Sequence, residues 1–224
     1  MIRAVIFDMY ETLITHFNSP LYFGKQMAAD IGIPEKKFRE IWDTTDDDRT
    51  IGVLTLEEVV ERILRENGQY SETLFQELIG KRKATKVDCF RHLHEEIIPM
   101  LEGIKERKVY IGLISNCYYE EAEIIRKSML FPYFDAVYLS CEQGIQKPDK
   151  EIFRRCMEHL QVQPSECLYI GDGGSRELET AESLGMKAIQ AVWYLREGTT
   201  QPTGRKAEFE QAENPLEVLD FIHE

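Results

Sequence analysis

The sequence predicts an α/β fold in which a doubly wound parallel sheet is interrupted by an α-helical insert. Two observations lead to this prediction. From about residue 88 onward, short apolar runs alternate with helical patterns, which is typical of a parallel sheet with helices on both faces. Between the first apolar run and that point, residues 19–86 have helical periodicity and no convincing strand, which indicates a helical insert.

The first strand is predicted at the apolar run from Ala4 to Phe7. A run this short, rich in β-branched and aromatic residues, suits an interior strand of a parallel sheet. Asp8 follows it directly, and a short turn with Tyr10 and Thr12 comes next. Because functional groups gather at the carboxyl ends of such strands, Asp8 lies where a chemical group is expected.

The clearest helix of the insert begins after Thr55. Thr55 and Glu58 have the spacing of a capping box, in which each residue satisfies a backbone N–H of the other. Apolar residues then recur at helical intervals over the following turns. The pair Asn67-Gly68 is a typical end signal for a helix.

After the insert, helices and strands alternate almost to the end of the chain. Strands are predicted at residues 109–114, 136–139, 167–170 and 187–192. Helices are predicted at residues 93–101, 120–129, 149–160 and 175–184, with a short closing helix at 215–222. The polar stretch from Arg196 to Asn214 contains Gly, Thr and Pro and is predicted to be a loop.

Length and composition limit the class of protein. At 224 residues the chain has room for one large core and a smaller inserted domain. We therefore predict a core domain of residues 1–14 and 88–224, and a helical cap domain of residues 15–87. The hydrophobic content of 43% and the charged content of 30% are ordinary for a soluble globular protein. The net charge of -13 argues against nucleic acid and anionic membranes as partners.

Several features predict a cytoplasmic protein. No apolar stretch approaches the ~20 residues that a membrane-spanning helix needs. The N-terminus leads straight into a core strand and does not resemble a signal peptide. The five cysteines have no CxxC spacing, which favours reduced and mostly buried thiols. The five histidines show no metal-ligand spacing.

Polar residues occur at four strand ends or in the loops that follow them. They are Asp8 with Thr12, then Ser115-Asn116, then Lys147-Pro148, and last Gly171-Asp172 with Glu177 five residues later. If the strands are parallel, all four groups meet at one edge of the sheet. In this order, and with a helical insert after the first motif, they resemble the haloacid dehalogenase superfamily of hydrolases. The resemblance covers the whole chain and implies a Rossmann-like core.

The resemblance implies a role for each polar residue. Asp8 would be the nucleophile, since a carboxylate at a strand end can form a covalent intermediate. Ser115 would donate a hydrogen bond to the transferring phosphoryl group, with Asn116 nearby as part of the substrate-binding set. Lys147 would neutralise charge on both nucleophile and substrate, because its ammonium is a compact point charge. Thr12 would fix the turn and orient the leaving-group side.

A magnesium site is also implied by the resemblance. Asp8, the backbone carbonyl of Tyr10 and Asp172 would bind Mg²⁺, an ion that prefers hard oxygen ligands and retains several waters. Glu177 would hold the metal waters or Lys147. The alternative for Glu177 is that it complements the dipole of the helix that it begins.

Tyr10 departs from the phosphatase pattern of this family, in which an aspartate protonates the leaving oxygen and later activates water. A tyrosine, with a pKa near ~10, is a poor base at neutral pH. Family members that remove halide from 2-haloacids commonly have a tyrosine here, but they usually need no metal and carry serine and asparagine in the fourth motif. The chain also has Glu11 where the family most often has glycine.

The predicted function is therefore Mg²⁺-dependent hydrolysis of a small phosphate ester through an aspartyl-phosphate on Asp8. One alternative is a metal-independent 2-haloacid dehalogenase, which Tyr10 favours. A second alternative is a non-catalytic binding protein with a degenerate site. The predicted partner is a small anionic molecule, and the protein is expected to be a monomer or a homodimer.

Three further features have simpler interpretations. The run from Asp46 to Asp48 is interpreted as a solvated face. Arg49 is interpreted as a surface arginine, with a clamp for an anionic substrate as the alternative. Cys117, close to Ser115, is interpreted as a buried, unreactive thiol.

Overall fold

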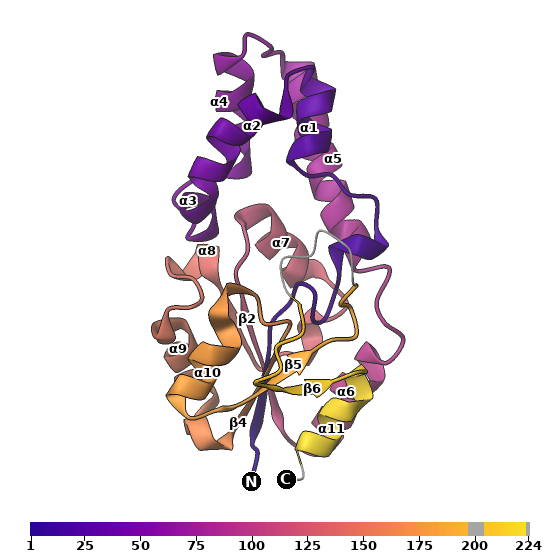
Figure 1. The fold of residues 1–224 in the computed structure, drawn as a ribbon, viewed down its shortest axis with the longest axis vertical. Coiled ribbons are helices and arrows are strands. Elements are labelled where there is room, and N and C mark those ends of the chain that lie inside the picture. The colour runs from indigo at the N-terminus through magenta and orange to yellow at the C-terminus, as the bar shows by residue number, and fades with distance from the viewer. Residues whose placement is uncertain (197–203, 223–224) are drawn as a thin grey trace.

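The structure is a computed structural model that describes residues 1–196 and 204–222 (Figure 1). Its centre is a six-stranded sheet with the order β3-β2-β1-β4-β5-β6, and every neighbouring pair is parallel. The strands are β1 (Ala4–Phe7), β2 (Tyr110–Ser115), β3 (Ala136–Leu139), β4 (Cys167–Gly171), β5 (Lys187–Ala191) and β6 (Glu210–Ala212). The predicted doubly wound parallel sheet is confirmed.

The strand order reverses between β1 and β4. From β1 the chain proceeds outward through β2 and β3, and it then returns to β4 on the other side of β1 before continuing to β5 and β6. In sheets of this kind, ligands bind outside the carboxyl ends of the strands at the point of reversal. Asp8 follows β1 and Asp172 follows β4, so two of the predicted site residues lie at this point.

Helices cover both faces of the sheet. The bounds are α6 (Ile97–Glu106), α7 (Tyr119–Lys127), α8 (Ser140–Gln143), α9 (Lys150–Leu160), α10 (Glu177–Leu184) and α11 (Val218–Phe221). Val5 and Phe7 of β1 share a hydrophobic cluster with α6, α7 and α11. Ala4 and Ile6 share another with α9 and α10. Burial on both faces explains why the first strand is continuously apolar rather than alternating.

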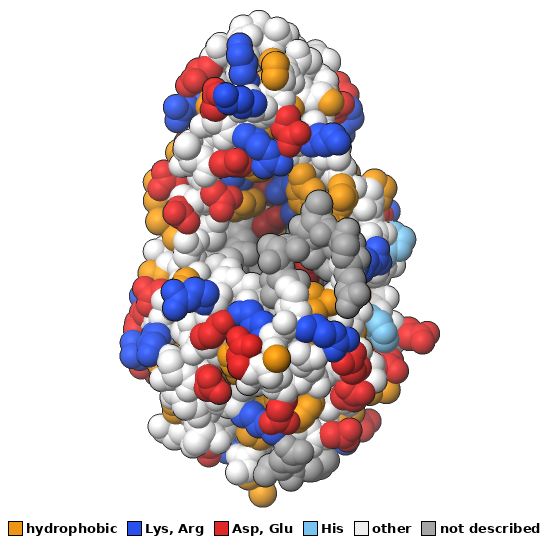
Figure 2. All heavy atoms as spheres, in the orientation of Figure 1, with side chains coloured by type: hydrophobic (Ala, Val, Ile, Leu, Met, Phe, Trp, Pro, Cys, Tyr) orange, Lys and Arg blue, Asp and Glu red, His pale blue; other side chains and the backbone are white. Residues whose placement is uncertain are grey.

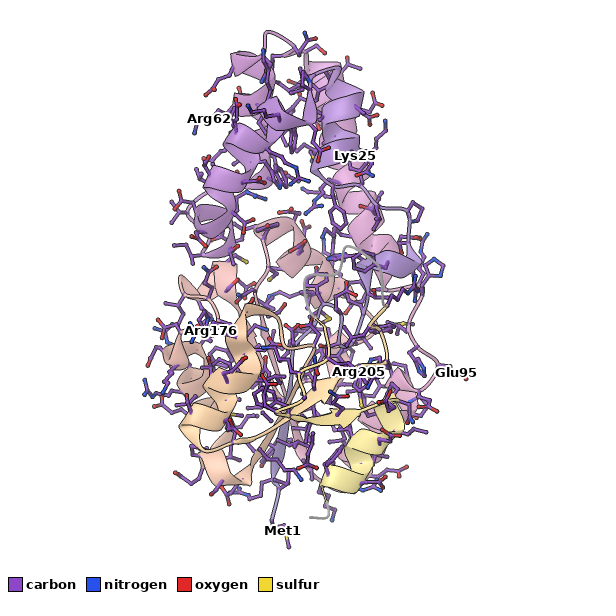
Figure 3. The ribbon with its side chains drawn as sticks, viewed as in Figure 1. Met1, Lys25, Arg62, Glu95, Arg176 and Arg205 are labelled. Atoms are coloured by element: carbon purple, nitrogen blue, oxygen red, sulfur yellow. The ribbon has the colours of Figure 1, made fainter. Side chains whose placement is uncertain are left out.

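The insert is made of five helices that stand above the carboxyl ends of the strands (Figure 1). They are α1 (Gly24–Ile31), α2 (Glu35–Trp42), α3 (Asp46–Thr50), α4 (Leu56–Glu66) and α5 (Glu72–Cys89). They enclose a hydrophobic cluster of their own, while charged side chains such as Lys25 and Arg62 cover the outside (Figure 3). The predicted capping box of α4 is present, with the Glu58 N–H donating to Thr55 Oγ1 at 3.2 Å. The domain boundary at residue 87 stays a prediction and falls within the last turn of α5.

Short 3-10 segments complete the described chain. They are η1 (His16–Asn18), η2 (Asp43–Thr45), η3 (Phe131–Tyr133), η4 (Pro164–Glu166), η5 (Gly174–Arg176) and η6 (Pro215–Glu217). The closing helix predicted at 215–222 is therefore divided into η6 and α11. The helix predicted from residue 93 begins later, at Ile97. Within the described ranges, no helix has both the length and the apolar character needed to cross a bilayer.

The loop predicted from Arg196 to Asn214 is wrong in part. Residues 197–203 lie outside the described residues, but Glu210–Ala212 forms β6 and pairs with β5. The buried Gln190 of β5 holds this stretch: its amide donates to the carbonyl of Gly204 at 2.8 Å and accepts from the N–H of Lys206 at 2.8 Å. A strand of three residues held by a side-chain amide has no apolar periodicity by which the sequence could reveal it.

Candidate active site

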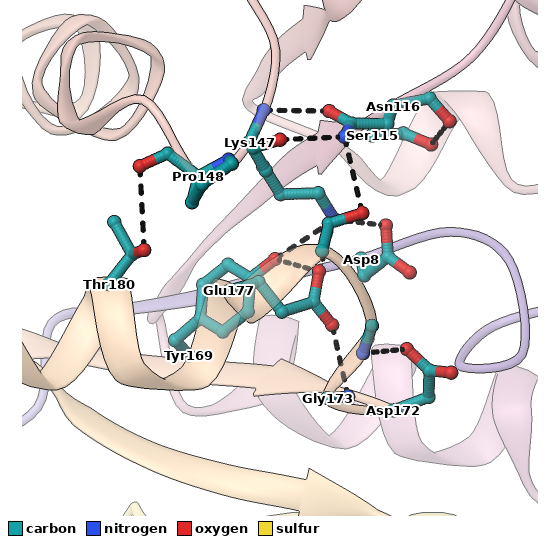
Figure 4. Close-up of polar contacts among 12 residues, drawn as sticks. Asp8, Ser115, Asn116, Lys147, Pro148, Tyr169, Asp172, Gly173, Glu177 and Thr180 are labelled. Atoms are coloured by element: carbon teal, nitrogen blue, oxygen red, sulfur yellow. Dashed lines mark hydrogen bonds and ion pairs between the residues drawn. The ribbon is translucent and has the colours of Figure 1, made fainter. Parts of the chain in front are cut away.

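Lys147 lies at the centre of the candidate site (Figure 4). Its Nζ donates to Asp8 Oδ1 at 2.6 Å, contacts the carboxylate of Glu177, and lies 3.3 Å from the hydroxyl of Tyr169. The Tyr169 hydroxyl donates to Glu177 Oε2 at 3.1 Å. All four side chains are buried. One polar network therefore forms from residues distant in sequence, which lie at the end of β1, within β4, at the start of α10 and in the loop before α9.

Charge in this network is unbalanced. Burial lowers the pKa of the Lys147 ammonium, but Asp8 and Glu177 outweigh burial and raise that pKa above its ordinary value. Burial raises the pKa of Glu177 to about 8, Asp8 and Asp172 add to the rise, and Lys147 opposes it. Oxygen atoms of Asp8, Asp172 and Glu177 lie within 4.8 Å of one another. One ammonium thus faces three carboxyl groups, an arrangement that a bound cation would stabilise.

The turn after β4 brings Asp172 and Glu177 together. Gly171 is required there because a Cβ atom at this position would overlap the carboxylate of Glu177. The N–H of Gly173 donates to Glu177 Oε1 at 3.3 Å, and the N–H of Gly174 donates to Asp172 Oδ1 at 2.8 Å. The Gly-Asp-Gly-Gly sequence is therefore more than a tight turn, because its backbone orients both acids.

Asn116 fixes the backbone of Lys147. Its Oδ1 accepts from the N–H of Lys147 at 2.8 Å, and its Nδ2 donates to the carbonyl of Lys147 at 3.0 Å and to Ser175 Oγ at 3.3 Å. Ser115, fully buried at the end of β2, has its hydroxyl 3.5 Å from the carbonyl oxygen of Asn116. The substrate-binding roles of Ser115 and Asn116 stay predictions. The geometry adds a positioning contact between Asn116 and Lys147 that the sequence did not indicate.

Tyr10 and Thr12 lie beside the network and differ in their surroundings. The Tyr10 ring stacks on His16 with 4.6 Å between ring centroids. Its hydroxyl is buried without a hydrogen-bond partner among the described residues. Burial raises the pKa of Tyr10 well above its ordinary value, and Glu121 raises it further. Thr12 is fully buried, its hydroxyl also lacks a described partner, and its carbonyl accepts from Trp193 Nε1 at 2.8 Å.

Glu11 occupies a backbone conformation that favours glycine. Its φ of 58° lies in the left-handed region, which an L-residue with a Cβ occupies only at a cost. The carboxylate compensates in part, since it accepts from Thr15 Oγ1 at 2.5 Å and from the N–H of His16 at 3.0 Å. Glu11 therefore ties the turn after β1 to the start of η1.

A cavity of about 550 Å³ opens above the network, between the insert and the sheet, and Figure 2 shows the surface hollowed there. Asn116 and Lys147 line it from the sheet, and Arg82 and Lys86 line it from α5. Sequence reasoning missed the two α5 residues. A signal was present, because the buried residues of α5 (Leu78, Ile79, Arg82, Lys86 and Cys89) have helical spacing and two of them are cations.

The interpretation of Arg49 as a surface arginine is wrong. Its side chain is 1% exposed, and its guanidinium lies 3.8 Å from the Trp42 ring centroid and 4.3 Å from that of Tyr118. Planar guanidinium groups stack well on aromatic rings, which is why this cation is buried. Arg49 is also absent from the cavity lining, so the clamp alternative finds no support. Asp46 is exposed, as predicted, but accepts from the Tyr118 hydroxyl at 2.5 Å.

Comparison with known proteins identifies the family. The sequence profile of the haloacid dehalogenase-like hydrolases matches residues 2–185. The phosphorylated carbohydrates phosphatase of Thermotoga maritima is 27% identical in an alignment of 206 positions that covers 85% of this chain and 85% of that protein.

Two solved structures share the fold. The phosphatase of the same family from Thermococcus onnurineus superimposes with a TM-score of 0.67 and 20% identity, covering 99% of this chain and 98% of that one. A 2-haloacid dehalogenase from Pseudomonas syringae superimposes with a TM-score of 0.67 and 21% identity, covering 100% of this chain and 99% of that one. Since the family profile spans most of the sequence and the sheet matches these structures, the chain belongs to the haloacid dehalogenase-like hydrolases.

Proposed function

We propose that the protein is a Mg²⁺-dependent phosphatase that hydrolyses a small phosphate ester through an aspartyl-phosphate on Asp8. The observation that carries this proposal is the buried group of Asp8, Asp172 and Glu177, whose oxygen atoms lie within 4.8 Å of one another. These acids lie where the strand order reverses, and within the described residues the ammonium of Lys147 contacts two of them, Asp8 and Glu177. Attack on carbon by one carboxylate requires no such group of acids.

The residues present fit a magnesium ion. All the candidate ligands are hard oxygen atoms, namely the carboxylates of Asp8 and Asp172 and the backbone carbonyl of Tyr10, with Glu177 behind them. When bound, Mg²⁺ would supply positive charge next to the phosphoryl oxygens of the substrate. The surplus of carboxyl groups over ammonium groups gives the site a physical reason to take up a cation.

In the first step, a carboxylate oxygen of Asp8 attacks phosphorus. The bond between phosphorus and the ester oxygen breaks, and that oxygen leaves as an alcohol after taking a proton from water. Lys147 holds Oδ1 of Asp8 at 2.6 Å, which orients the carboxylate and leaves Oδ2 for the attack. The clamp of Asn116 on the Lys147 backbone keeps that ammonium in place, and Ser115 would donate to a phosphoryl oxygen.

In the second step, water attacks the phosphorus of the aspartyl-phosphate. The bond between phosphorus and the Asp8 oxygen breaks, and inorganic phosphate and the Asp8 carboxylate result. This step benefits from a general base. Tyr10 occupies the position of that base, but burial keeps its phenol protonated. The second step is therefore expected to be slow relative to the first.

We further propose that residues 15–87 act as a cap domain over the site. Contacts between insert and sheet support this: the Tyr118 hydroxyl donates to Asp46 at 2.5 Å, and Gln146 Nε2 donates to Asp47 at 2.8 Å. Both acids belong to α3 of the insert, and both donors belong to the sheet part. A cap held in this way excludes water from the reacting groups.

Calorimetric titration with Mg²⁺ tests the metal site. The wild-type protein should bind Mg²⁺, Asp172→Asn should weaken binding strongly, and Asp43→Asn, an exposed acid in the insert, should leave it unchanged. Hydrolysis of p-nitrophenyl phosphate should stop on addition of EDTA and in Asp8→Asn. Equal Mg²⁺ affinity in wild type and Asp172→Asn would overturn the assignment.

Dehalogenation is the second candidate, and Tyr10 is the observation that favours it. In that reaction Asp8 would attack carbon and displace halide, and water would hydrolyse the resulting ester. Chloride release from 2-chloropropionate in the presence of EDTA, without phosphatase activity in Mg²⁺, would replace the proposal with this one. A protein that binds Mg²⁺ but is inert toward both substrates would instead support the non-catalytic alternative.

A further inference from the structure

The cavity between insert and sheet has two walls of different character. One part of its lining is Asn116 and Lys147, which belong to the candidate site. Another part is Arg82 and Lys86 of α5 with Glu121 of α7, which lie beside one another. At about 550 Å³ it has the size of a small-molecule site. Asp8 lines an adjoining cavity of about 530 Å³, and the two cavities share Tyr10, Asn116 and Lys147. A phosphate ester whose phosphoryl group lies at Asp8 has a route past these shared residues for its organic part to reach α5.

The wall contributed by α5 is cationic. Arg82 and Lys86 lie one helical turn apart, and each is 3% exposed. Glu121 is the buried carboxylate that lines the cavity beside them, with Oε1 at 2.5 Å from Lys86 Nζ. Glu120 is buried as well but does not line the cavity, and burial raises its pKa, which disfavours its charge. Two basic side chains thus lie beside Glu121 at this wall, and only Glu121 of the two acids also lines the cavity.

The contacts of these cations are incomplete. Arg82 donates from Nη1 to the carbonyl of Tyr22 at 3.1 Å. Its nearest carboxylate oxygens, on Glu120 and Glu121, lie at 3.7 and 3.6 Å, too far for a hydrogen bond of ordinary length. Arg82 Nε, which faces the Glu120 oxygen at 3.7 Å, has no hydrogen-bond partner among the described residues. A buried guanidinium with unmet donors is stabilised when an anion reaches it.

Lys86 has a similar need for negative charge. Its second polar contact is His16 Nε2, at 3.2 Å. Burial lowers the pKa of Lys86 and Arg82 lowers it further, while Glu121 raises it. Burial and the two cations also lower the pKa of His16, so its imidazole is neutral and accepts from Lys86. An anion placed between Arg82 and Lys86 would relieve the repulsion between these two cations.

We propose that Arg82 and Lys86 bind a second acidic group on the organic part of the substrate, so that the substrate is a small phosphate ester that also carries a carboxylate or a second phosphate. This inference rests on the proposed function, because it concerns the leaving-group side of the same site. A carboxylate suits the fork of a guanidinium, and a phosphate suits the same pair of donors. The two sources are separated by the substrates of the test.

Matched substrates test the inference on the wild-type protein itself. 3-Phosphoglycerate has a carboxylate where glycerol 3-phosphate has a hydroxymethyl group, and the two are otherwise the same. In glycerol 1,3-bisphosphate the hydroxyl of that hydroxymethyl group carries a second phosphate. Release of inorganic phosphate in Mg²⁺ gives kcat/KM for each. The wild type should favour an acidic substrate over glycerol 3-phosphate by about 10- to 100-fold, the range of a charge-assisted hydrogen bond. The preferred acidic substrate identifies the second group.

Variants of Arg82 and Lys86 then test whether these α5 residues cause the preference for acidic substrates. Arg82→Gln and Lys86→Met should each reduce the ratio of kcat/KM between acidic and neutral substrate by about tenfold or more. Arg82→Lys, which keeps the charge but loses the fork, should retain part of the preference. The control is Lys83→Met, because Lys83 lies on the same helix but pairs with Glu57 and does not line the cavity. It should leave the ratio unchanged.

The outcomes separate the two proposals. If the wild type hydrolyses glycerol 3-phosphate and p-nitrophenyl phosphate as efficiently as the acidic esters, the inference is wrong and the proposed phosphatase stands. A preference that survives both Arg82→Gln and Lys86→Met would also overturn it. If the wild type releases phosphate from none of these esters, the proposed function fails, and this inference fails with it.

Discussion

Replacing Tyr10 with phenylalanine is expected to leave hydrolysis of the aspartyl-phosphate almost unchanged, whereas replacement with aspartate is expected to accelerate it. The reason is the environment of the phenol. Its oxygen is buried and has no hydrogen-bond partner among the described residues, and burial raises its pKa well above its ordinary value. The hydroxyl is thus held in its protonated form and cannot accept the proton of the attacking water.

The size of the effect follows from the pKa. With a pKa of 10, about one tyrosine in a thousand is ionised at neutral pH, and a general base is worth about 10² to 10⁴ in rate. At the upper end of that range the product of these two factors is about ten, so loss of the hydroxyl lowers the rate by about tenfold at most. The raised pKa makes the loss smaller. An aspartate is ionised at neutral pH, so Tyr10→Asp should gain about 10²-fold, the lower end of that range, because its shorter side chain leaves space beside His16.

Stopped-flow kinetics with p-nitrophenyl phosphate and Mg²⁺ separate the two steps. Wild type and Tyr10→Phe should both show a burst of p-nitrophenolate equal to the enzyme concentration, followed by similar slow turnover. Tyr10→Asp should show the faster second phase. If Tyr10→Phe slows the second phase by about 10² or more, the phenol takes part in catalysis and the reasoning from its burial is wrong.

Three further predictions follow from the backbone and the buried acids. Gly52→Ala should lower the Tm by more than Gly32→Ala. Both glycines have positive φ, but only at Gly52 would a Cβ overlap backbone atoms, those of Cys141 in α8. An equal decrease in Tm in the two variants would contradict this contact. Glu11→Gly should lower the free energy of unfolding, measured in urea, by about 1–2 kcal/mol. The variant loses the two hydrogen bonds of the Glu11 carboxylate, and this loss outweighs the backbone strain that glycine relieves. A higher free energy of unfolding in the variant would contradict this prediction. Burial raises the pKa of Glu120 in the folded state, so the unfolded chain loses this proton first, and the contribution of Glu120 to the free energy of unfolding falls as pH rises above about 4.3. Glu120→Gln should therefore match the wild type near pH 4 and exceed it at pH 7 in urea midpoint, and a constant difference between the two would refute this assignment.

The strands and the polar network were largely predictable from the sequence. The apolar run before Asp8 marks β1 because both of its faces are buried. Parallel strands with adjacent carboxyl ends then bring Asp8, Lys147 and Asp172 together. Each of these inferences needs only local patterns and one rule of topology.

The burial of Arg49 and the cationic wall of the cavity could not be predicted, because they depend on contacts between residues that are distant in sequence. The burial of Arg49 requires Trp42 and Tyr118 from two parts of the chain. The cationic wall of the cavity forms because α5 packs on α7, which brings Arg82 close to Glu121. A charged residue is ordinarily exposed, so a pattern of charges predicts a solvated face unless its partner is known.

The order of the sheet also has a consequence for how the chain folds. The central strand β1 is the first to be synthesised, yet one of its two neighbours, β4, begins at Cys167. Until then one edge of a fully apolar strand has no partner, and pairing across such a sequence separation is slow. The insert, in contrast, makes its hydrophobic cluster from consecutive helices and can form early. During synthesis, β1 is thus an apolar segment that needs protection from aggregation, and Asp8 at its end reaches Lys147 only after most of the chain has been made.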